Sequence, residues 1–274
     1  LVRMLDNVIE FFINNAPDQL SRASYSAMRE RSLGLGAMGF HAYLQRHSIP
    51  FESAMAKGRN LQMFGRIKGE AVRATRQLAT ERGECPDGEG YGVRNAHLLA
   101  IAPNASSSII CGNTSPSIEP YRANAFTQKT KSGSSLLKNE YLEDTLQDLG
   151  YDTDDVWKSI LTNGGSVQHL EFLDQWTKDV FKTAVEIDQR WVIEMAGDRQ
   201  EFICQSQSLN VFFPANISKQ ELHAVHMMAW KRGVKTLYYL RSEAMKRAEN
   251  VSDEVLRQYI FDSIDDEGCL ACEG

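Results

Sequence analysis

The clearest structural boundary in this sequence lies at Gly233, where a helix gives way to a short apolar segment. Ser218 and Glu221 have the spacing of a capping box, which favours a helix start, and a basic last turn before Gly233 favours a helix end. Residues 234–240 come directly after this end and are mostly apolar or aromatic. The pattern predicts a helix that leads straight into a short buried strand.

The predicted strand carries two adjacent tyrosines, Tyr238 and Tyr239. Because successive side chains on a strand point to opposite faces, we expect the two phenol rings to lie on opposite sides of it. One interpretation is that both are ordinary half-buried strand aromatics. The other is that each ring has a role that the other cannot fill, and this segment alone does not choose between them.

A second boundary, here from strand to helix, follows the apolar run at residues 97–102. The run stops at Pro103-Asn104-Ala105-Ser106-Ser107, which has the composition of a turn and a helix start. Free backbone N–H groups and small hydroxyl side chains at a helix start can hold phosphate oxygens. Plain N-capping is the alternative, since Asn and Ser are the commonest caps.

Two cysteines, Cys269 and Cys272, lie within the last six residues, behind an acidic stretch with little apolar surface to bury. Two thiols complete only half of the tetrahedral ligand set of a structural zinc site. A disulfide between them would close a loop too small to constrain much of the unfolded chain. Redox exchange and a dispensable tail therefore stay open as interpretations.

Charge and hydropathy exclude some classes of partner. A formal net charge of -6 argues against binding to the phosphate backbone of nucleic acid, which depends on dense lysine and arginine. No apolar run approaches the roughly 18 residues of a membrane span. Five cysteines without a secretory signal suggest a reducing compartment, so we expect a soluble cytoplasmic protein with no nucleic-acid or membrane partner.

The remaining sequence gives a coarse secondary-structure prediction. Residues 1–82 read as mainly helical and residues 116–133 as an irregular loop, and further helices are expected at 139–149, 154–161 and 170–196. Gly34-x-Gly36-x-x-Gly39 fits the dinucleotide-binding fingerprint as a pattern, but charged, helix-like residues precede it in place of a buried strand. We interpret these glycines as positions of close helix packing.

Taken in order, several motifs resemble the C-terminal part of the large catalytic subunit of class I ribonucleotide reductase. They are residues 31–40 (RSLGLGAMGF), 102–108 (APNASSS), 113–120 (NTSPSIEP) and 205–210 (QSQSLN), then the tyrosine pair and the cysteine tail. The resemblance implies an α/β fold, the helix-rich C-terminal half of the family's ten-stranded barrel, over residues 1–261. It also implies a flexible redox-active tail at residues 262–274.

The resemblance further implies a function, the radical reduction of ribonucleoside diphosphates to 2'-deoxyribonucleotides. Tyr238 and Tyr239 match the stacked tyrosines that relay the radical from a metal-containing small subunit. The turn at residues 103–107, formed by Pro103, Asn104, Ala105, Ser106 and Ser107, matches the binding site for the substrate's phosphates. Cys269 and Cys272 match the tail thiols that re-reduce the active-site disulfide and are themselves reduced by thioredoxin or glutaredoxin.

Some parts of the family's machinery are absent from this sequence. The thiyl cysteine of the family lies in an Asn-x-Cys-x-Glu segment, and none of Cys85, Cys111 and Cys204 has those neighbours. We therefore interpret these three as buried or incidental thiols, and expect the chain to bind no cofactor or metal itself. The expected partner is the remaining N-terminal part of the large subunit, because the chain opens in the middle of a domain.

Two rival functions stay open. A B12-dependent reductase of the same superfamily would share the phosphate turn and the tail cysteines, but it makes its radical locally and does not need the tyrosine pair. A non-catalytic phosphate-binding module would need neither the tyrosines nor the terminal thiols.

Overall fold

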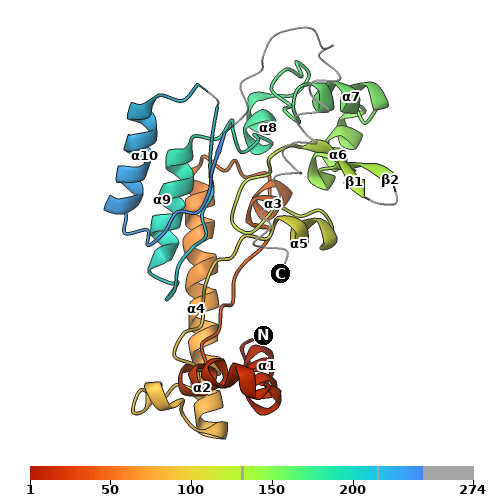
Figure 1. Cartoon of the computed structure of the whole chain (residues 1–274). Coiled ribbons are helices and arrows are strands. Elements are labelled where there is room, and N and C mark those ends of the chain that lie inside the picture. Colours follow the sequence, from red (N-terminus) through yellow and green to blue (C-terminus); the bar gives the residue numbers. More distant parts are fainter. Residues whose placement is uncertain (131–132, 215, 243–274) are drawn as a thin grey trace.

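The computed structural model describes residues 1–130, 133–214 and 216–242, and most of the regular structure in them is helical. The long helix α4 (Ala54–Arg82) forms a spine to which α1 and α2 attach at one end (Figure 1). The other helices are α1 (Val2–Asn15), α2 (Ser21–Glu30), α3 (Phe40–Arg46), α5 (Ala105–Ile110), α6 (Glu140–Leu149), α7 (Asp154–Thr162), α8 (Gln175–Val180), α9 (Gln189–Gln200) and α10 (Lys219–Lys231), with 3-10 turns at Asp18–Leu20 and Pro86–Gly88. The strands are β1 (Ala125–Thr130), β2 (Gly133–Lys138), β3 (Val211–Phe213) and β4 (Leu240–Ser242).

Extended segments that are far apart in the sequence lie side by side as a parallel ladder. Leu35 pairs with Leu99, and Ile101, two residues further on, pairs with Gln207. The segment that contains Gln207 continues into β3, which pairs in parallel with β4. Parallel neighbours need long crossover connections, and α4 and α10 lie in two of them. This alternation of extended segments and helices confirms the α/β prediction.

The hydrophobic core is divided into two clusters. The larger lies where α4 and α9 pack on each other and on the ladder, and it includes Phe64, Ile193 and Leu99. The smaller joins β1, α6 and α7, with Trp157 as its largest fully buried side chain. Burying a side chain of this size contributes at least about 1.5–3 kcal/mol. Each cluster therefore stabilises its own group of helices.

A buried polar network joins the two groups. The side-chain amide of Asn139, at the start of α6, donates to Gln45 Oε1 in α3 (2.8 Å) and to Asn124 Oδ1 (2.9 Å). Asn124 in turn donates to the carbonyl of Phe181 (2.7 Å). All three polar side chains are at most 3% exposed, so losing one partner would leave buried polar atoms unsatisfied.

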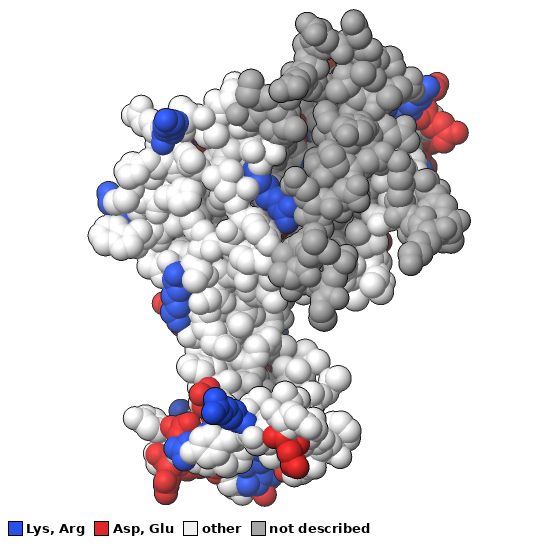
Figure 2. Space-filling view, viewed as in Figure 1, with Lys and Arg blue, Asp and Glu red and all other residues white. Residues whose placement is uncertain are grey.

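On the face that Figure 2 shows, charged side chains of both signs gather at the end of the molecule where α1, α2 and the end of α4 meet (Figures 1 and 2). The centre of this cluster is Asp6, which is fully buried and accepts from Arg31 (3.0 Å) and Arg82 (2.9 Å).

Among the described residues, no helix is both long and apolar enough to cross a membrane.

Several secondary-structure predictions need correction. Residues 31–39 are not helical, because their backbone pairs with residues 97–100 in the ladder. The predicted loop at 116–133 contains β1, which pairs with β2 as an antiparallel hairpin. The predicted helix at 170–196 is two helices, since the side chains of Asp174 and Asp188 each cap a separate start. The helices expected at 139–149 and 154–161 are confirmed as α6 and α7.

Candidate active site

The serine-rich turn lies where the ladder segment at residues 98–101 ends and α5 begins. Asn104 occupies the N-cap position but makes no side-chain capping hydrogen bond, so plain N-capping does not explain its presence. Ser106 and Ser107 are exposed, whereas Ser108 is buried and donates to the carbonyl of Ala105 (2.8 Å). The turn therefore presents two free-standing hydroxyl groups beside the backbone N–H groups of a helix start.

Glycines let the neighbouring segment come close to this turn. A Cβ atom on Gly36 would lie 2.8 Å from the carbonyl oxygen of Ala100. Gly39 has φ +82, and a Cβ atom there would lie 2.7 Å from Thr114 Oγ1. The close packing predicted for the glycine pattern is thus found, but its partners are an extended segment and a loop, not a second helix. The dinucleotide pattern has no strand before it that would place it at a cofactor's phosphates.

Tyr238 and Tyr239 lie against each other. Their ring centroids are 4.1 Å apart at an interplanar angle of 49°, and the Tyr238 hydroxyl donates to the Tyr239 hydroxyl at 3.4 Å. The prediction that the rings point to opposite faces is therefore wrong. Its premise fails because regular strand begins only at Leu240, so the alternation of a strand does not apply to the residues before it.

The pair is placed at the end of the ladder and is partly open to solvent. The Tyr238 N–H donates to the carbonyl of Leu209 (2.8 Å), and the Tyr239 carbonyl accepts from the Val211 N–H (3.0 Å). Tyr238 is 40% exposed and Tyr239 is 36% exposed, so both rings are half-buried, and their exposure alone does not choose between the two interpretations. The guanidinium carbon of Arg241 lies 4.9 Å from the centroid of the Tyr239 ring.

Two buried polar residues next to the pair were not predicted from the sequence. Asn210 accepts the Tyr239 N–H on its side-chain oxygen (3.0 Å), and Glu119 accepts the Asn210 N–H (3.2 Å). Burial raises the pKa of Glu119, against hydrogen bonds from Asn210 and the positive charges of Arg122 and Arg241. Both residues belong to motifs quoted above, 113–120 and 205–210, but the motifs alone give no chemical role for them.

The ladder brings the serine-rich turn and the tyrosine pair to neighbouring segments. Ile101 precedes the turn and pairs with Gln207, and the next residues of that segment pair with the strand that follows the tyrosines. A second link is the loop after α5, where the Thr114 N–H donates to the carbonyl of Ser108 (3.1 Å) and Glu119 contacts Asn210. Both candidate sites therefore lie on one framework.

Three of the five cysteines lie in the described part of the chain, and the two tail cysteines lie outside it. Cys85 is buried, Cys111 is exposed at the end of α5, and all three cysteines in the described part of the chain are free thiols. The sulfur of Cys204 accepts from the N–H groups of Leu98 and Leu99, both at 3.2 Å, and so helps to pack the ladder. Cys269 and Cys272 lie outside the described residues.

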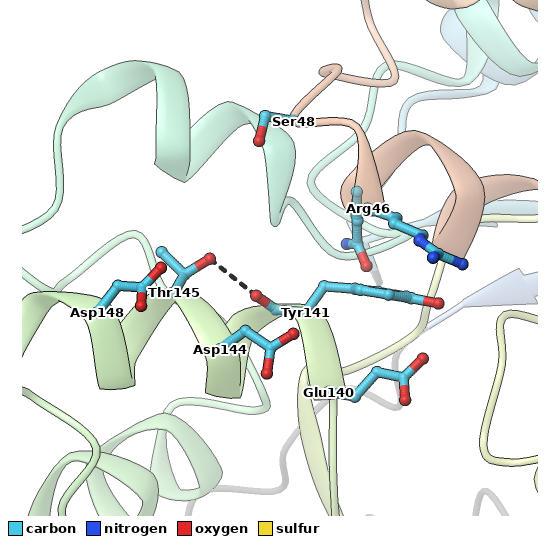
Figure 3. Close-up of a pocket in the computed structure, with 8 residues that line it drawn as sticks. Arg46, Ser48, Glu140, Tyr141, Asp144, Thr145 and Asp148 are labelled. Atoms are coloured by element: carbon cyan, nitrogen blue, oxygen red, sulfur yellow. Dashed lines mark hydrogen bonds between the residues drawn. The ribbon is translucent and has the colours of Figure 1, made fainter.

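A surface pocket of about 440 Å³ lies elsewhere, between α3 and α6. Figure 3 shows Glu140, Asp144 and Asp148 along one side of α6, with Arg46 of α3 opposite. None of the predicted site residues lines it. Among the described residues, no group of three or more His, Cys, Asp or Glu side chains is arranged to hold a metal ion.

The fold agrees with the comparison with known families. The family model described as the ribonucleotide reductase barrel domain matches residues 1–90 and 86–240. The chain belongs to this family, which confirms the resemblance seen in the sequence motifs.

Individual relatives are similar over nearly the whole chain. The chain is 49% identical over 277 residues to the putative ribonucleoside-diphosphate reductase large subunit of Frog virus 3, and this covers 100% of the chain and 48% of the relative. It is 44% identical to the ribonucleoside-diphosphate reductase large subunit of Invertebrate iridescent virus 3, covering 98% and 43% respectively. The class Id ribonucleotide reductase alpha subunit of Actinobacillus ureae has the same fold, with a TM-score of 0.80 and 40% identity over 86% of this chain and 44% of that one. The chain thus spans about half the length of these relatives, or less.

Proposed function

We propose that this chain forms the C-terminal part of the catalytic barrel of a ribonucleoside-diphosphate reductase, which reduces ribonucleoside diphosphates to 2'-deoxyribonucleoside diphosphates. Family membership and the names of the relatives support the reaction. The thiyl cysteine would come from the remaining N-terminal part of the large subunit, because this sequence has no Asn-x-Cys-x-Glu segment. The radical would come from a separate, metal-containing small subunit.

The observation that carries the proposal is the contact between Tyr238 and Tyr239. A radical step between them moves one electron and one proton: the O–H bond of the reduced phenol breaks, and an O–H bond forms on the oxidised one. Hydroxyl oxygens 3.4 Å apart with rings in contact suit this exchange, because both particles move over a short distance. Their partial exposure suits a relay that receives the radical from another chain.

The turn formed by Pro103, Asn104, Ala105, Ser106 and Ser107 is the proposed binding site for the substrate's phosphates. Its uncapped helix start and exposed hydroxyls support this role. Backbone N–H groups would supply most of the attraction, and each hydroxyl that donates to a charged oxygen would add about 1–2 kcal/mol. No side chain of the turn is acidic, so nothing in it repels an anion.

Cys269 and Cys272 are the proposed shuttle for reducing equivalents. Their two thiols would be oxidised to a disulfide as they reduce the active-site disulfide to two thiols, and thioredoxin or glutaredoxin would then reduce them again. A shuttle is needed because a protein reductant is too bulky to reach a disulfide inside a barrel.

The tyrosine contact also favours this proposal over its rivals. A B12-dependent reductase generates its radical next to the substrate and gives Tyr238 and Tyr239 no task. A phosphate-binding module without catalytic activity would not need two phenol oxygens in contact.

Reconstitution tests the proposal as a whole. The chain would be combined with a large-subunit segment that carries Asn-x-Cys-x-Glu, a class I small subunit and a small dithiol, and conversion of cytidine diphosphate to its deoxy form would be measured. We expect product only when all the proteins are present. A complex that assembles and binds substrate but forms no product would refute the proposed reaction.

A further inference from the structure

The backbone of Tyr239 is held by a side chain. Its N–H donates to Oδ1 of Asn210 at 3.0 Å, while its carbonyl makes an ordinary ladder bond to the Val211 N–H. Asn210 directly precedes β3. The acceptor for the Tyr239 N–H is thus a side-chain oxygen of the neighbouring segment and not a backbone carbonyl of the ladder. This fixes the backbone of Tyr239 just before regular strand begins at Leu240.

Asn210 is itself held rigidly. It is 4% exposed, and Oε1 of Glu119, which is 2% exposed, accepts its N–H at 3.2 Å. The side-chain oxygen of Asn210 accepts the Tyr239 N–H, so the buried amide has one favoured orientation, because turning it over would leave that N–H without an acceptor in the interior.

This arrangement accounts for the contact between the two rings. In a regular strand, adjacent side chains would project to opposite faces and the phenol oxygens would be far apart. Here the Tyr238 N–H bonds to the Leu209 carbonyl, and the Tyr239 N–H bonds to the Asn210 side chain. The backbone of both tyrosines is therefore fixed outside strand geometry, with the ring centroids at 4.1 Å.

We propose that Asn210 and Glu119 are positioning residues for the tyrosine pair: Asn210 sets the backbone of Tyr239, and Glu119 sets Asn210. That these two residues hold the rings in place follows from the contacts alone. The consequence for radical transfer rests on the function proposed above. Neither residue takes part in a chemical step. Without them the rings separate, and the short path between the phenol oxygens is lost.

Fluorine NMR of the 274-residue chain tests the geometric part without turnover. Biosynthetic replacement of the nine tyrosines by 3-fluorotyrosine gives the signals, and Tyr238→Phe and Tyr239→Phe variants assign the pair. Each ring shifts the resonance of the other while they are in contact. In Asn210→Ala and in the milder Asn210→Ser, we expect both resonances to move towards those of isolated exposed tyrosines.

Two further variants separate positioning from general loss of stability. Asn124→Ala removes another buried, hydrogen-bonded asparagine, and it should leave the resonances of the pair unchanged. Glu119→Gln keeps an acceptor oxygen for the Asn210 N–H, and it should also preserve them. If both Asn210 variants keep the mutual shift of the pair, the proposal is overturned.

The consequence for catalysis is measured separately in the reconstituted enzyme. Asn210→Ser should lower kcat at least tenfold, which is about 1.4 kcal/mol, with little change in KM. Separated rings together with normal kcat would show that the positioning is real and that the relay function is wrong. Unchanged rings together with normal kcat would show that the positioning itself is wrong.

Discussion

The hydroxyl oxygens of Tyr238 and Tyr239 lie 3.4 Å apart, although strand geometry would send neighbouring side chains to opposite faces. The contact depends on irregular backbone before Leu240 and on hydrogen bonds from the adjacent segment. The alternation expected of a strand therefore gives the wrong orientation for Tyr238 and Tyr239, the two residues on which the proposed radical relay depends.

The phosphate site predicts unequal effects at Ser107. Ser107→Ala should weaken binding of a ribonucleoside diphosphate by only about 1–2 kcal/mol, because the backbone N–H groups remain. Ser107→Asp should abolish detectable binding, since it places a like charge against the phosphate. Calorimetric titration of the reconstituted large subunit measures both, and normal affinity in Ser107→Asp would count against the site.

A packing prediction concerns Gly36. Gly36→Ala would place a methyl group 2.8 Å from the carbonyl oxygen of Ala100, and backbone cannot move aside cheaply. We expect a loss of about 1–3 kcal/mol in the free energy of unfolding, measured by urea titration. The matched control is Gly58→Ala within α4, where nothing lies within 4 Å and helix propensity should instead add about 0.5–1 kcal/mol. Equal effects of the two changes would contradict the packing at Gly36.

The buried charge cluster predicts acid sensitivity. Burial alone would raise the pKa of Asp6, but the hydrogen bond and charge of Arg31, together with Asn95 and Arg94, lower the pKa below its ordinary value of 3.8. A lowered folded-state pKa gives stability that is present above the unfolded-state pKa and is lost as the pH falls through the folded-state value. The loss should therefore begin near pH 3.8 and continue below it.

Substitution tests the same cluster. Asp6→Asn leaves Arg31 without its buried partner and should cost about 3–5 kcal/mol at pH 7. With Asn at this position, the free energy of unfolding should also depend less on pH below about 3.8. Glu70→Gln removes an exposed pair with Arg73 and should change stability by less than about 1 kcal/mol. A large effect of Glu70→Gln with a small effect of Asp6→Asn would reverse the predicted ranking.

The tail prediction separates redox exchange from a dispensable tail. Cys269→Ser or Cys272→Ser should block multiple turnovers driven by thioredoxin, yet leave turnover driven by a small dithiol largely intact. A small dithiol can enter the barrel, whereas thioredoxin reaches only thiols that come out to meet it. Full thioredoxin-dependent activity after deletion of residues 269–274 would leave the tail without this function.

Local chemistry explains which features could be predicted from the sequence. The helix at Ser218 follows from its capping box, and the turn at Pro103 follows from an apolar run that stops at Pro, Asn and Ser. Those signals are encoded by residues a few positions apart. The family resemblance was likewise carried by short motifs, and the match over residues 1–240 confirms it.

What could not be predicted depends on residues distant in sequence. Nothing near Gly36 indicates that Ala100 will pack against it, and residues 31–39 are extended only because a neighbouring segment lies beside them. Glu119 and Asn210 are 91 residues apart, so their contact has no local signal. Substitution patterns across many relatives are the kind of signal that could have indicated these pairs.

The most direct test of the account is turnover by Tyr239→Phe in the reconstituted enzyme. Phe preserves the packing against Tyr238 but cannot be oxidised at accessible potentials, so substrate binding should be normal while deoxynucleotide formation falls below detection. Tyr238→Phe should behave in the same way, and Tyr91→Phe, at an exposed tyrosine in the loop before the ladder segment at residues 98–101, should be fully active. Normal deoxynucleotide production by Tyr239→Phe would contradict the radical relay on which the proposed function depends.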